Sequence, residues 1–418
     1  MEQPQSRFFY GWIIVFAGLF LSLIMFGIVD AFGVMFKSIS GQFDWDRGTI
    51  SVASMVNWIC FGVGNLVCGI LTDRFGSRRL LIVGGIIFII GTFLMSQIQS
   101  LWHLYFAFGV VIAIGRSAAA VPLTALITKW FTRNQGLALA IAQSQNVGPA
   151  VFAPLTVFLL SQTDWRGAYI WLGVGTLLII PLAFLIRDYE EGAAGTVQPL
   201  GKGGAATNYM PQVHLTLGQA ARTRAFWTLN LMVIGCCVCH SCILLHGFNH
   251  MTDMGLAGST ASRVAAVMAL SGMVGKIICG MLADRVGGKW AMAFFLGLQA
   301  IMVPPFINAH APSSFYLWAI AFGLGYGGPM PVYAMLFREY FGTRSIGSIL
   351  GVFFMVAAVG MGSGGLMGGE LYDIFGSYAI PFMTSSGAGL MSALLALTLP
   401  ATRREPVETT PQVVLQPS

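Results

Sequence analysis

The chain has 418 residues, of which 56% are hydrophobic and only 9% are charged. Because a soluble domain carries roughly 25% charged residues, this composition excludes an ordinary soluble protein and indicates an integral membrane protein. The net charge of +6 is spread over short loops between apolar segments, so it indicates membrane topology and does not favour a nucleic-acid partner.

Each membrane-spanning helix needs about 20 mostly apolar residues. On this basis we predict an all-α membrane protein with twelve transmembrane helices, at about residues 10–36, 48–72, 79–98, 101–129, 135–161, 167–187, 223–250, 260–283, 289–309, 313–337, 345–371 and 377–400. The predicted organisation is a six-helix half at 1–187, a linker rich in Gly, Ala and polar residues at 188–222, a second six-helix half at 223–400 and a tail at 401–418. Within 215–227 we expect a short helix along the membrane surface.

The basic loop residues lie mostly on one side of the predicted helices. The opposite loops hold only Lys37, Arg47, Arg166 and Arg263. Since basic loops stay on the cytoplasmic side, both termini are predicted to be cytoplasmic, in a plasma membrane or a bacterial inner membrane.

One motif occurs twice in the chain. The segment Gly69–Gly76 (GILTDRFG) returns as Gly280–Gly287 (GMLADRVG), and Asp73 and Asp284 are 211 residues apart. An offset of half the chain, each time just after an apolar stretch, predicts two homologous halves around a pseudo-two-fold axis. In such membrane proteins the substrate binds near mid-depth between the halves.

Two basic residues lie inside predicted helices. Charge near the bilayer centre is costly, so Arg116 and Lys276 are candidate functional residues. The 211-residue offset pairs Lys276 with Asn65, and aligning the ends of the two helices pairs Arg116 with Tyr326. The two cations, one from each half, predict a site that holds an anion from both sides. For Arg116, a structural or proton-relay role is the alternative.

Other polar residues in the helices are candidates for substrate or proton handling. Asp30 is either a proton carrier or a static partner of one of the cations. His246 and His250, four residues apart on one helical face, could bind substrate or a proton, or could be satisfied polar groups near the outer mouth. Asn146 and Tyr333 could hydrogen-bond a substrate or serve packing.

No cofactor is expected, because no phosphate-binding or dinucleotide-binding motif occurs in a suitable context. Cys236, Cys239 and His240 share a face, but cysteine also packs well between membrane helices, so no metal site is predicted. No nucleophile and base stand together in a way that predicts an enzyme.

The D-R-x-G-x-R/K pattern after two equivalent helices, together with the twelve helices, resembles the major facilitator superfamily over essentially the whole chain. The resemblance implies that this pattern acts at a cytoplasmic gate, through Asp73, Arg74, Arg78, Asp284 and Arg285. The alternative is that these charges only fix the topology.

Further strings resemble the monocarboxylate and oxalate–formate carriers. Val274–Asp284 is similar to their eighth helix, with Lys276 in the place of an arginine that binds carboxylate, and with Gly272 where vertebrate members have an acidic residue. Lys129–Ala140 and His246–Gly255 are similar to further segments of this branch. The resemblance implies secondary active transport of a small organic anion such as lactate, pyruvate or oxalate. Proton symport is favoured, and an anion exchanger or a drug exporter on the same fold is the alternative.

Overall fold

The computed structural model describes residues 10–45, 47–131, 134–144, 148–189 and 214–400. Apolar, helix-forming sequence dominates these residues, and within them the secondary structure is helical throughout. The helices before the linker are α1 Gly11–Phe43, α2 Arg47–Phe75, α3 Ser77–Met95, α4 Leu101–Leu104, η1 Tyr105–Ile112, α5 Ala113–Trp130, α6 Gln135–Ala142, α7 Gly148–Gln162, α8 Trp165–Thr176 and α9 Ile179–Phe184. The last part of the linker holds α10 Leu217–Ala220, and the helices after the linker are α11 Arg224–Asp253, α12 Gly258–Val286, α13 Gly288–Ile301, α14 Val303–Ile307, α15 Pro312–Gly327, α16 Pro329–Phe341, α17 Ile346–Phe375 and α18 Ala379–Thr398.

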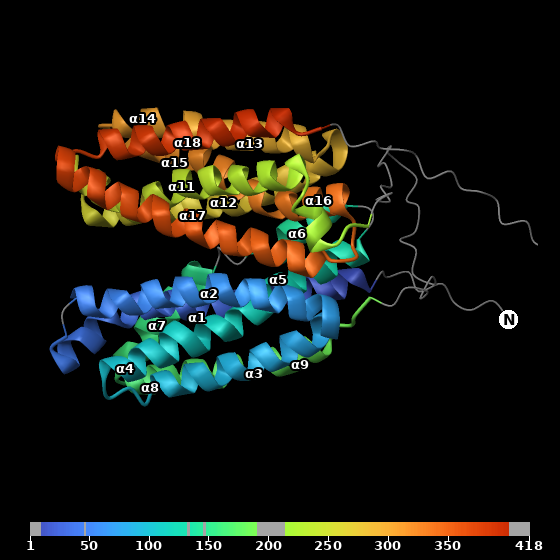
Figure 1. The fold of residues 1–418 in the computed structure, drawn as a ribbon. Helices are drawn as coiled ribbons and strands as arrows, with labels where there is room; N and C mark the ends of the chain where they lie inside the picture. Colours follow the sequence, from blue (N-terminus) through green and yellow to red (C-terminus); the bar gives the residue numbers. More distant parts are fainter. Residues whose placement is uncertain (1–9, 46, 132–133, 145–147, 190–213, 401–418) are drawn as a thin grey trace, which may run out of the picture.

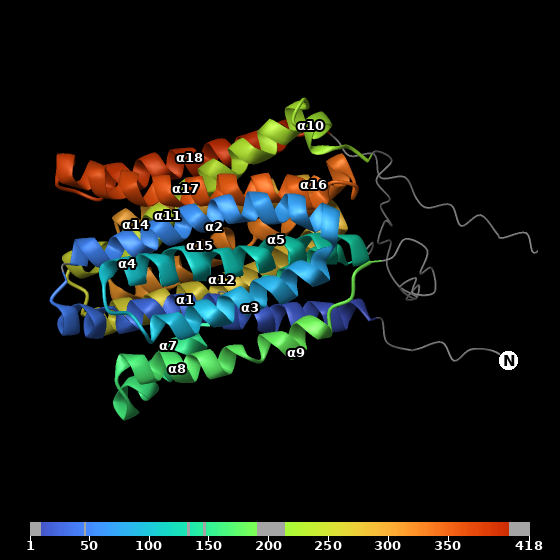
Figure 2. The same ribbon diagram turned by 60° about the horizontal axis from the view of Figure 1, so that its bottom comes forward.

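Within the described residues, eleven helical stretches are long and apolar enough to cross a membrane, and Val151–Gln162 is a shorter apolar helix. Many large hydrophobic side chains on these helices face outward, as lipid-facing residues do. The helices run roughly side by side in two bundles, one containing α1–α3, α5 and α7–α9, the other containing α11–α18 (Figures 1 and 2).

Three local expectations can be compared with the structure. The span expected over 313–337 is divided in the structure, since α15 ends at Gly327 and α16 begins at Pro329. The expected short helix near residue 217 is confirmed as α10, which a capping box of Thr216 and Gln219 starts. The prediction of one helix over 135–161 is wrong. The structure has α6 and α7 there, and the proline at position 149 suits the first turn of a new helix.

The two bundles touch through the glycines of the repeated motif. A Cβ atom at Gly69 would lie 2.4 Å from the carbonyl oxygen of Gly347, and one at Gly280 would lie 2.4 Å from that of Gly136. Gly136 and Gly347 are themselves 211 residues apart, so the contacts α2–α17 and α12–α6 are equivalent. We call the end of the molecule that carries these contacts the motif end. It lies on the right in Figure 1, near the labels α6 and α16.

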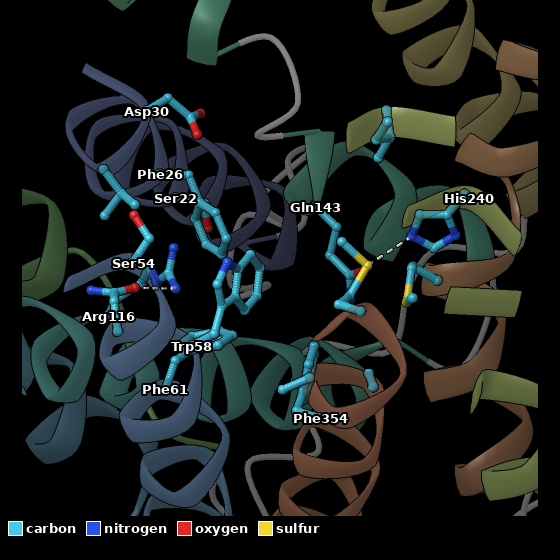
Figure 3. A pocket seen from close by; sticks show the side chains of 18 of the residues that line it. Ser22, Phe26, Asp30, Ser54, Trp58, Phe61, Arg116, Gln143, His240 and Phe354 are labelled. Carbon is cyan, nitrogen blue, oxygen red and sulfur yellow. Dashed lines mark hydrogen bonds between the residues drawn. The ribbon is translucent and has the colours of Figure 1, made fainter. Parts of the chain in front are cut away.

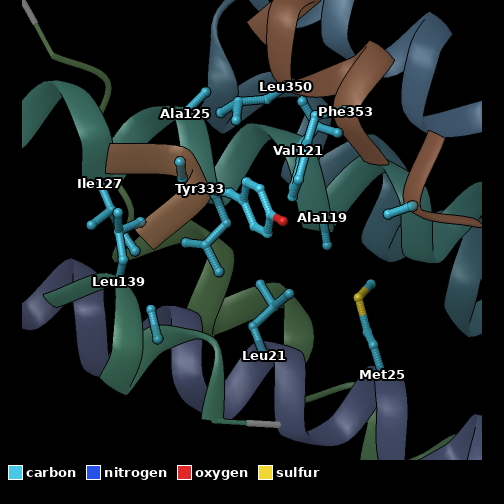
Figure 4. Packing of buried hydrophobic residues seen from close by; sticks show 14 of the residues in the cluster. Leu21, Met25, Ala119, Val121, Ala125, Ile127, Leu139, Tyr333, Leu350 and Phe353 are labelled. Carbon is cyan, nitrogen blue, oxygen red and sulfur yellow. The ribbon is translucent and has the colours of Figure 1, made fainter. Parts of the chain in front are cut away.

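A buried apolar layer packs across the two bundles near the motif end. The ring of Tyr333 on α16 lies among Leu21 of α1, Leu139 of α6 and several α5 residues of the other bundle, and its centroid is 5.2 Å from that of Phe353 (Figure 4). Tyr333 is fully buried. We call this buried layer, formed by Leu21, Leu139, Tyr333, Phe353 and the neighbouring α5 residues, the seal.

Candidate functional site

A cavity of about 700 Å³ lies between the two bundles, on the other side of the seal from the motif end. Four of the predicted site residues line it, namely Asp30, Arg116, Lys276 and Tyr326 (Figure 3 labels two of them). The rest of the lining is mostly apolar and aromatic, with a few polar groups; it includes Ser22, Phe26, Phe32, Ser54, Asn57, Trp58, Phe61, Phe108, Gln143, His240, Met330, Phe354 and Met361.

Arg116 is held inside a cage of aromatic rings. Its side chain is 2% exposed, and its guanidinium carbon lies 4.1 Å from the ring centroid of Phe61, with the rings of Phe26 and Trp58 at 5.0 and 5.2 Å. One guanidinium nitrogen donates to Asn57 Oδ1 at 3.0 Å. Cation–π contacts and this hydrogen bond together replace much of the lost hydration. The guanidinium of Arg116 is therefore already surrounded by protein partners where it lines the cavity.

Asn57 is a site residue that the sequence reasoning missed. It is 2% exposed, and its Nδ2 donates to the carbonyl of Phe108 at 2.6 Å while its Oδ1 accepts from Arg116. The eight-residue π-helix η1 carries Phe108 and precedes Arg116 on the same span. A polar amide in the middle of apolar α2 is the signal that could have revealed it.

Asp30 lies one helical turn beyond Phe26 on α1 and lines the same cavity. Within the described part of the chain, no hydrogen bond or ion pair joins Asp30 to Arg116. The carboxylate is nevertheless close enough to interact electrostatically with that guanidinium. The first bundle therefore contributes an acid and a base whose charges influence each other.

Lys276 on α12 is the cation of the second bundle. Its side chain is 4% exposed, lines the cavity and donates from Nζ to the carbonyl of Gln143 at the end of α6, which belongs to the N-terminal half of the chain. Tyr326 lies nearby on α15. A Cβ atom at Gly272, one turn before Lys276, would lie 2.9 Å from the Tyr326 ring, so glycine leaves room for this aromatic wall.

At the motif end, each aspartate of the repeat binds the start of a helix in the other bundle. Asp73 accepts from the backbone of Gly347 at 2.9 Å and of Ser348 at 2.7 Å, in the first turn of α17. Asp284 accepts from the backbone of Gly136 at 2.9 Å and of Leu137 at 3.1 Å, in the first turn of α6. A carboxylate satisfies the unpaired N–H groups and the positive end of the helix dipole.

The basic residues of the motif do not share these contacts. Arg74 and Arg285 are exposed, and Arg74 stacks over Phe75. The backbone N–H of Arg78 donates to Asp188 Oδ1, so this part of the motif connects to the end of its own half. Arg338 of α16, which the sequence did not single out, is 5% exposed and joins the bundles by donating to Gln135 and to the carbonyl of Phe131.

A family model for the Major Facilitator Superfamily matches residues 15–262 and 241–416, which together cover most of the chain. The chain belongs to the Major Facilitator Superfamily. It is therefore a multi-pass membrane transporter, as the repeated motif and the helices predict.

Relatives within the Major Facilitator Superfamily include monocarboxylate transporters. The chain is 27% identical to monocarboxylate transporter 13 of Bos taurus, covering 96% of this chain and 91% of that protein. It is 25% identical to monocarboxylate transporter 11 of Homo sapiens, covering 94% and 83%. Among solved structures, the Escherichia coli fucose:proton symporter FucP has a TM-score of 0.72 at 12% identity, covering 93% of this chain and 97% of that chain. The likeness to FucP shows the fold.

Several predicted site residues of this superfamily member lie outside the cavity lining. Asn65 and Tyr333 are fully buried between helices, and within the described residues neither polar group has a hydrogen-bond partner. His246 Nε2 lies 2.9 Å from the carbonyl of Gly365, and His250 Nε2 lies 3.4 Å from that of Phe306. Asn146 lies outside the described residues.

His240, which shares a helical face with Cys236 and Cys239, lines the cavity. Its Nε2 lies 3.1 Å from Met361 Sδ and its Nδ1 lies 4.0 Å from Cys236 Sγ. Its ring also lies 5.8 Å from that of Tyr326. His240 therefore belongs to the same wall of the cavity as Tyr326.

Proposed function

We propose that this transporter carries a small organic anion, a mono- or dicarboxylate, together with a proton. The observation that carries this proposal is the buried ammonium of Lys276, placed in a mostly apolar and aromatic cavity between the two bundles. A cation in such surroundings attracts an anion strongly, because little water competes for it. The similarity to monocarboxylate transporters supports a carboxylate as that anion.

The other cavity residues have separate roles in this proposal. The substrate carboxylate binds Lys276, and the Tyr326 hydroxyl donates a second hydrogen bond. Arg116, which its aromatic cage shields, acts on Asp30 instead of on the substrate. Asp30 takes up a proton from the outer side and releases it after the carrier has changed state, so that the proton and the anion travel together.

Transport follows from alternating access between residues 1–187 and 223–400. The contacts of Asp73 and Asp284 close the motif end, which faces the cytoplasm with both termini, and Arg74, Arg78 and Arg285 line the cytoplasmic surface. The seal around Tyr333 must separate when the cavity opens to that side. The rival interpretation, that these charges only set topology, predicts that Asp73→Asn and Asp284→Asn leave the transport rate unchanged.

The test uses the purified chain in liposomes. Labelled lactate, pyruvate, oxalate, formate and succinate are offered with and without an inward proton gradient. We expect a saturable uptake of one acid that the gradient stimulates, that Lys276→Gln abolishes and that Lys276→Arg retains in part. Arg116→Gln should still bind the acid but should lose the stimulation by the gradient.

Two other outcomes have distinct meanings. Uptake that depends on an acid preloaded inside the liposomes, and not on the gradient, would show an anion exchanger. The aromatic lining of the cavity would also suit an amphipathic drug. Saturable transport of a neutral or cationic drug that Lys276→Gln leaves intact would overturn the carboxylate proposal.

A further inference from the structure

The short helix α6 is held at both ends by one helix of the opposite bundle. Asp284 of α12 accepts from the first turn of α6, through Gly136 and Leu137. Lys276 of α12 donates to the carbonyl of Gln143, the residue at the other end of α6. Asp284 and Lys276 are eight residues apart, about 12 Å along α12, which matches the length of the eight-residue α6. The two contacts therefore fit one helix between two side chains.

The charges of this pair complement the helix they hold. A carboxylate lies at the positive N-terminal end of α6 and an ammonium lies at its negative C-terminal end. A helix of eight residues has little stability of its own, because isolated helices shorter than about 12 residues are marginal in water. The contacts with α12 at its two ends are therefore important for where α6 lies.

Within the described part of the chain, the equivalent interface α2–α17 has no counterpart of the Lys276 contact. Asp73 of α2 binds the start of α17 as Asp284 binds the start of α6. The position equivalent to Lys276 is Asn65, whose amide atoms make no hydrogen bond within the described residues. Moreover, α17 continues unbroken for 30 residues, so its backbone carbonyls at that level are used inside the helix. Among the residues that the structure describes, a charged side chain binds a helix end at the cavity only in the α6–α12 interface.

We propose that Lys276 is a latch that holds the end of α6 in the empty carrier and releases it when an anion binds. A substrate carboxylate is a stronger acceptor for an ammonium than a backbone carbonyl. Binding of the anion from the cavity weakens the contact with Gln143, so that of the two α12 side chains only Asp284 still holds α6. The substrate site is in this way connected to the closed motif end through a single short helix. The identity of the anion rests on the function proposed above, whereas the latch itself does not.

The test measures opening of the motif end in the absence of any substrate. Spin labels are attached through cysteines at Arg79 and Trp290, two exposed residues 211 positions apart at the starts of α3 and α13. Pulsed electron resonance then gives the distance distribution between the bundles in the full chain in nanodiscs, with the chain lacking the added cysteines as background. Lys276→Gln should raise the fraction of long distances about tenfold, the change expected when a charge-assisted hydrogen bond is lost.

Two controls separate the latch from a general loss of packing. Asn65→Ala alters the equivalent position of the other half and should keep the parental distribution, and Lys276→Arg, which retains a charged donor, should also stay close to it. Lys276→Met repeats the loss of the donor if the glutamine variant does not fold. A parental distribution in both Lys276→Gln and Lys276→Met, or an equal shift in Asn65→Ala, would overturn the latch.

A second arm adds the five carboxylates to the parent chain. We expect one of them to shift the distribution in the direction of the Lys276→Gln variant, and to leave that variant unchanged. If the variant shifts but none of the acids shifts the parent, the latch stands and the proposed substrate class fails. If an acid shifts the parent and Lys276→Gln does not, the substrate class stands and the latch fails.

Discussion

A buried arginine is tolerated in this protein because its partners are built around it. Arg116 donates one hydrogen bond to Asn57 and lies against the rings of Phe26, Trp58 and Phe61. Asn57 is in turn held in place by the carbonyl of Phe108. These contacts fix the guanidinium at one depth and leave Lys276 as the cation that contacts the opposite bundle.

Two buried asparagines on α2 allow the stabilising effect of the Asn57–Arg116 hydrogen bond to be measured. Asn57 bonds a charged group, whereas the Asn65 amide has no partner within the described residues. Replacement by alanine removes the same atoms at both positions. Asn57→Ala should therefore lower the free energy of unfolding by about 2 kcal/mol more than Asn65→Ala does, because a hydrogen bond to a charged group contributes about 1.5–3 kcal/mol. Thermal unfolding of both variants, side by side, gives the difference. Equal melting temperatures would show that Asn57 does not stabilise Arg116.

At the scale of the helices, the interface between the bundles depends on pairs of glycines. At Gly69 and Gly280 the backbones approach so closely that a methyl group has no room. Small residues allow membrane helices to pack in this way, since packing and polar contacts replace the hydrophobic effect inside a bilayer. The aspartates one turn later can then reach the backbone N–H groups of α17 and α6.

Replacing these glycines by alanine should open the motif end and destabilise the closed state. The added methyl group meets a backbone carbonyl oxygen, which cannot move aside as a flexible side chain can. We expect Gly69→Ala and Gly280→Ala each to cost about 1–3 kcal/mol, as overpacking does. Gly362 of α17, where an added Cβ would meet nothing within 4 Å, is the control, and its alanine variant should be neutral or slightly stabilised. Melting temperatures that fall equally in all three variants would contradict this explanation.

The helices and the pairing of the motifs could be predicted from sequence, but much of the cavity could not. A pseudo-two-fold axis gives equivalent segments equivalent surroundings. The repeat therefore predicted correctly that Asp73 and Asp284 occupy equivalent positions in the two halves. The break after Ala142 was missed because the apolar composition continues through 135–161. The contact of Asn57 with Arg116 joins residues 59 positions apart, and no local pattern indicates which side chains will meet at that distance.

For the whole molecule, the distribution of polar contacts between the bundles is uneven. Every hydrogen bond that joins the bundles within the described residues lies at the motif end or at Lys276; the donors or acceptors are Asp73, Asp284, Arg338 and Lys276. The seal around Tyr333 closes the same side. The structure thus has the geometry of a carrier whose cavity is separated from the motif end.

This geometry predicts from which side a reagent reaches the cavity. In intact cells, a cysteine in place of Ser54, which lines the cavity, should react with a membrane-impermeant thiol reagent added outside. A cysteine in place of the exposed Arg79, at the motif end, should react only after the membrane is permeabilised, because the motif end is proposed to face the cytoplasm. The parent chain gives the background from the native cysteines, most of which are buried.

The reverse pattern would show that the orientation deduced from the basic loops is wrong. If neither position reacts from outside while Arg79→Cys reacts after permeabilisation, the cavity is closed on both sides and the carrier rests in an occluded state.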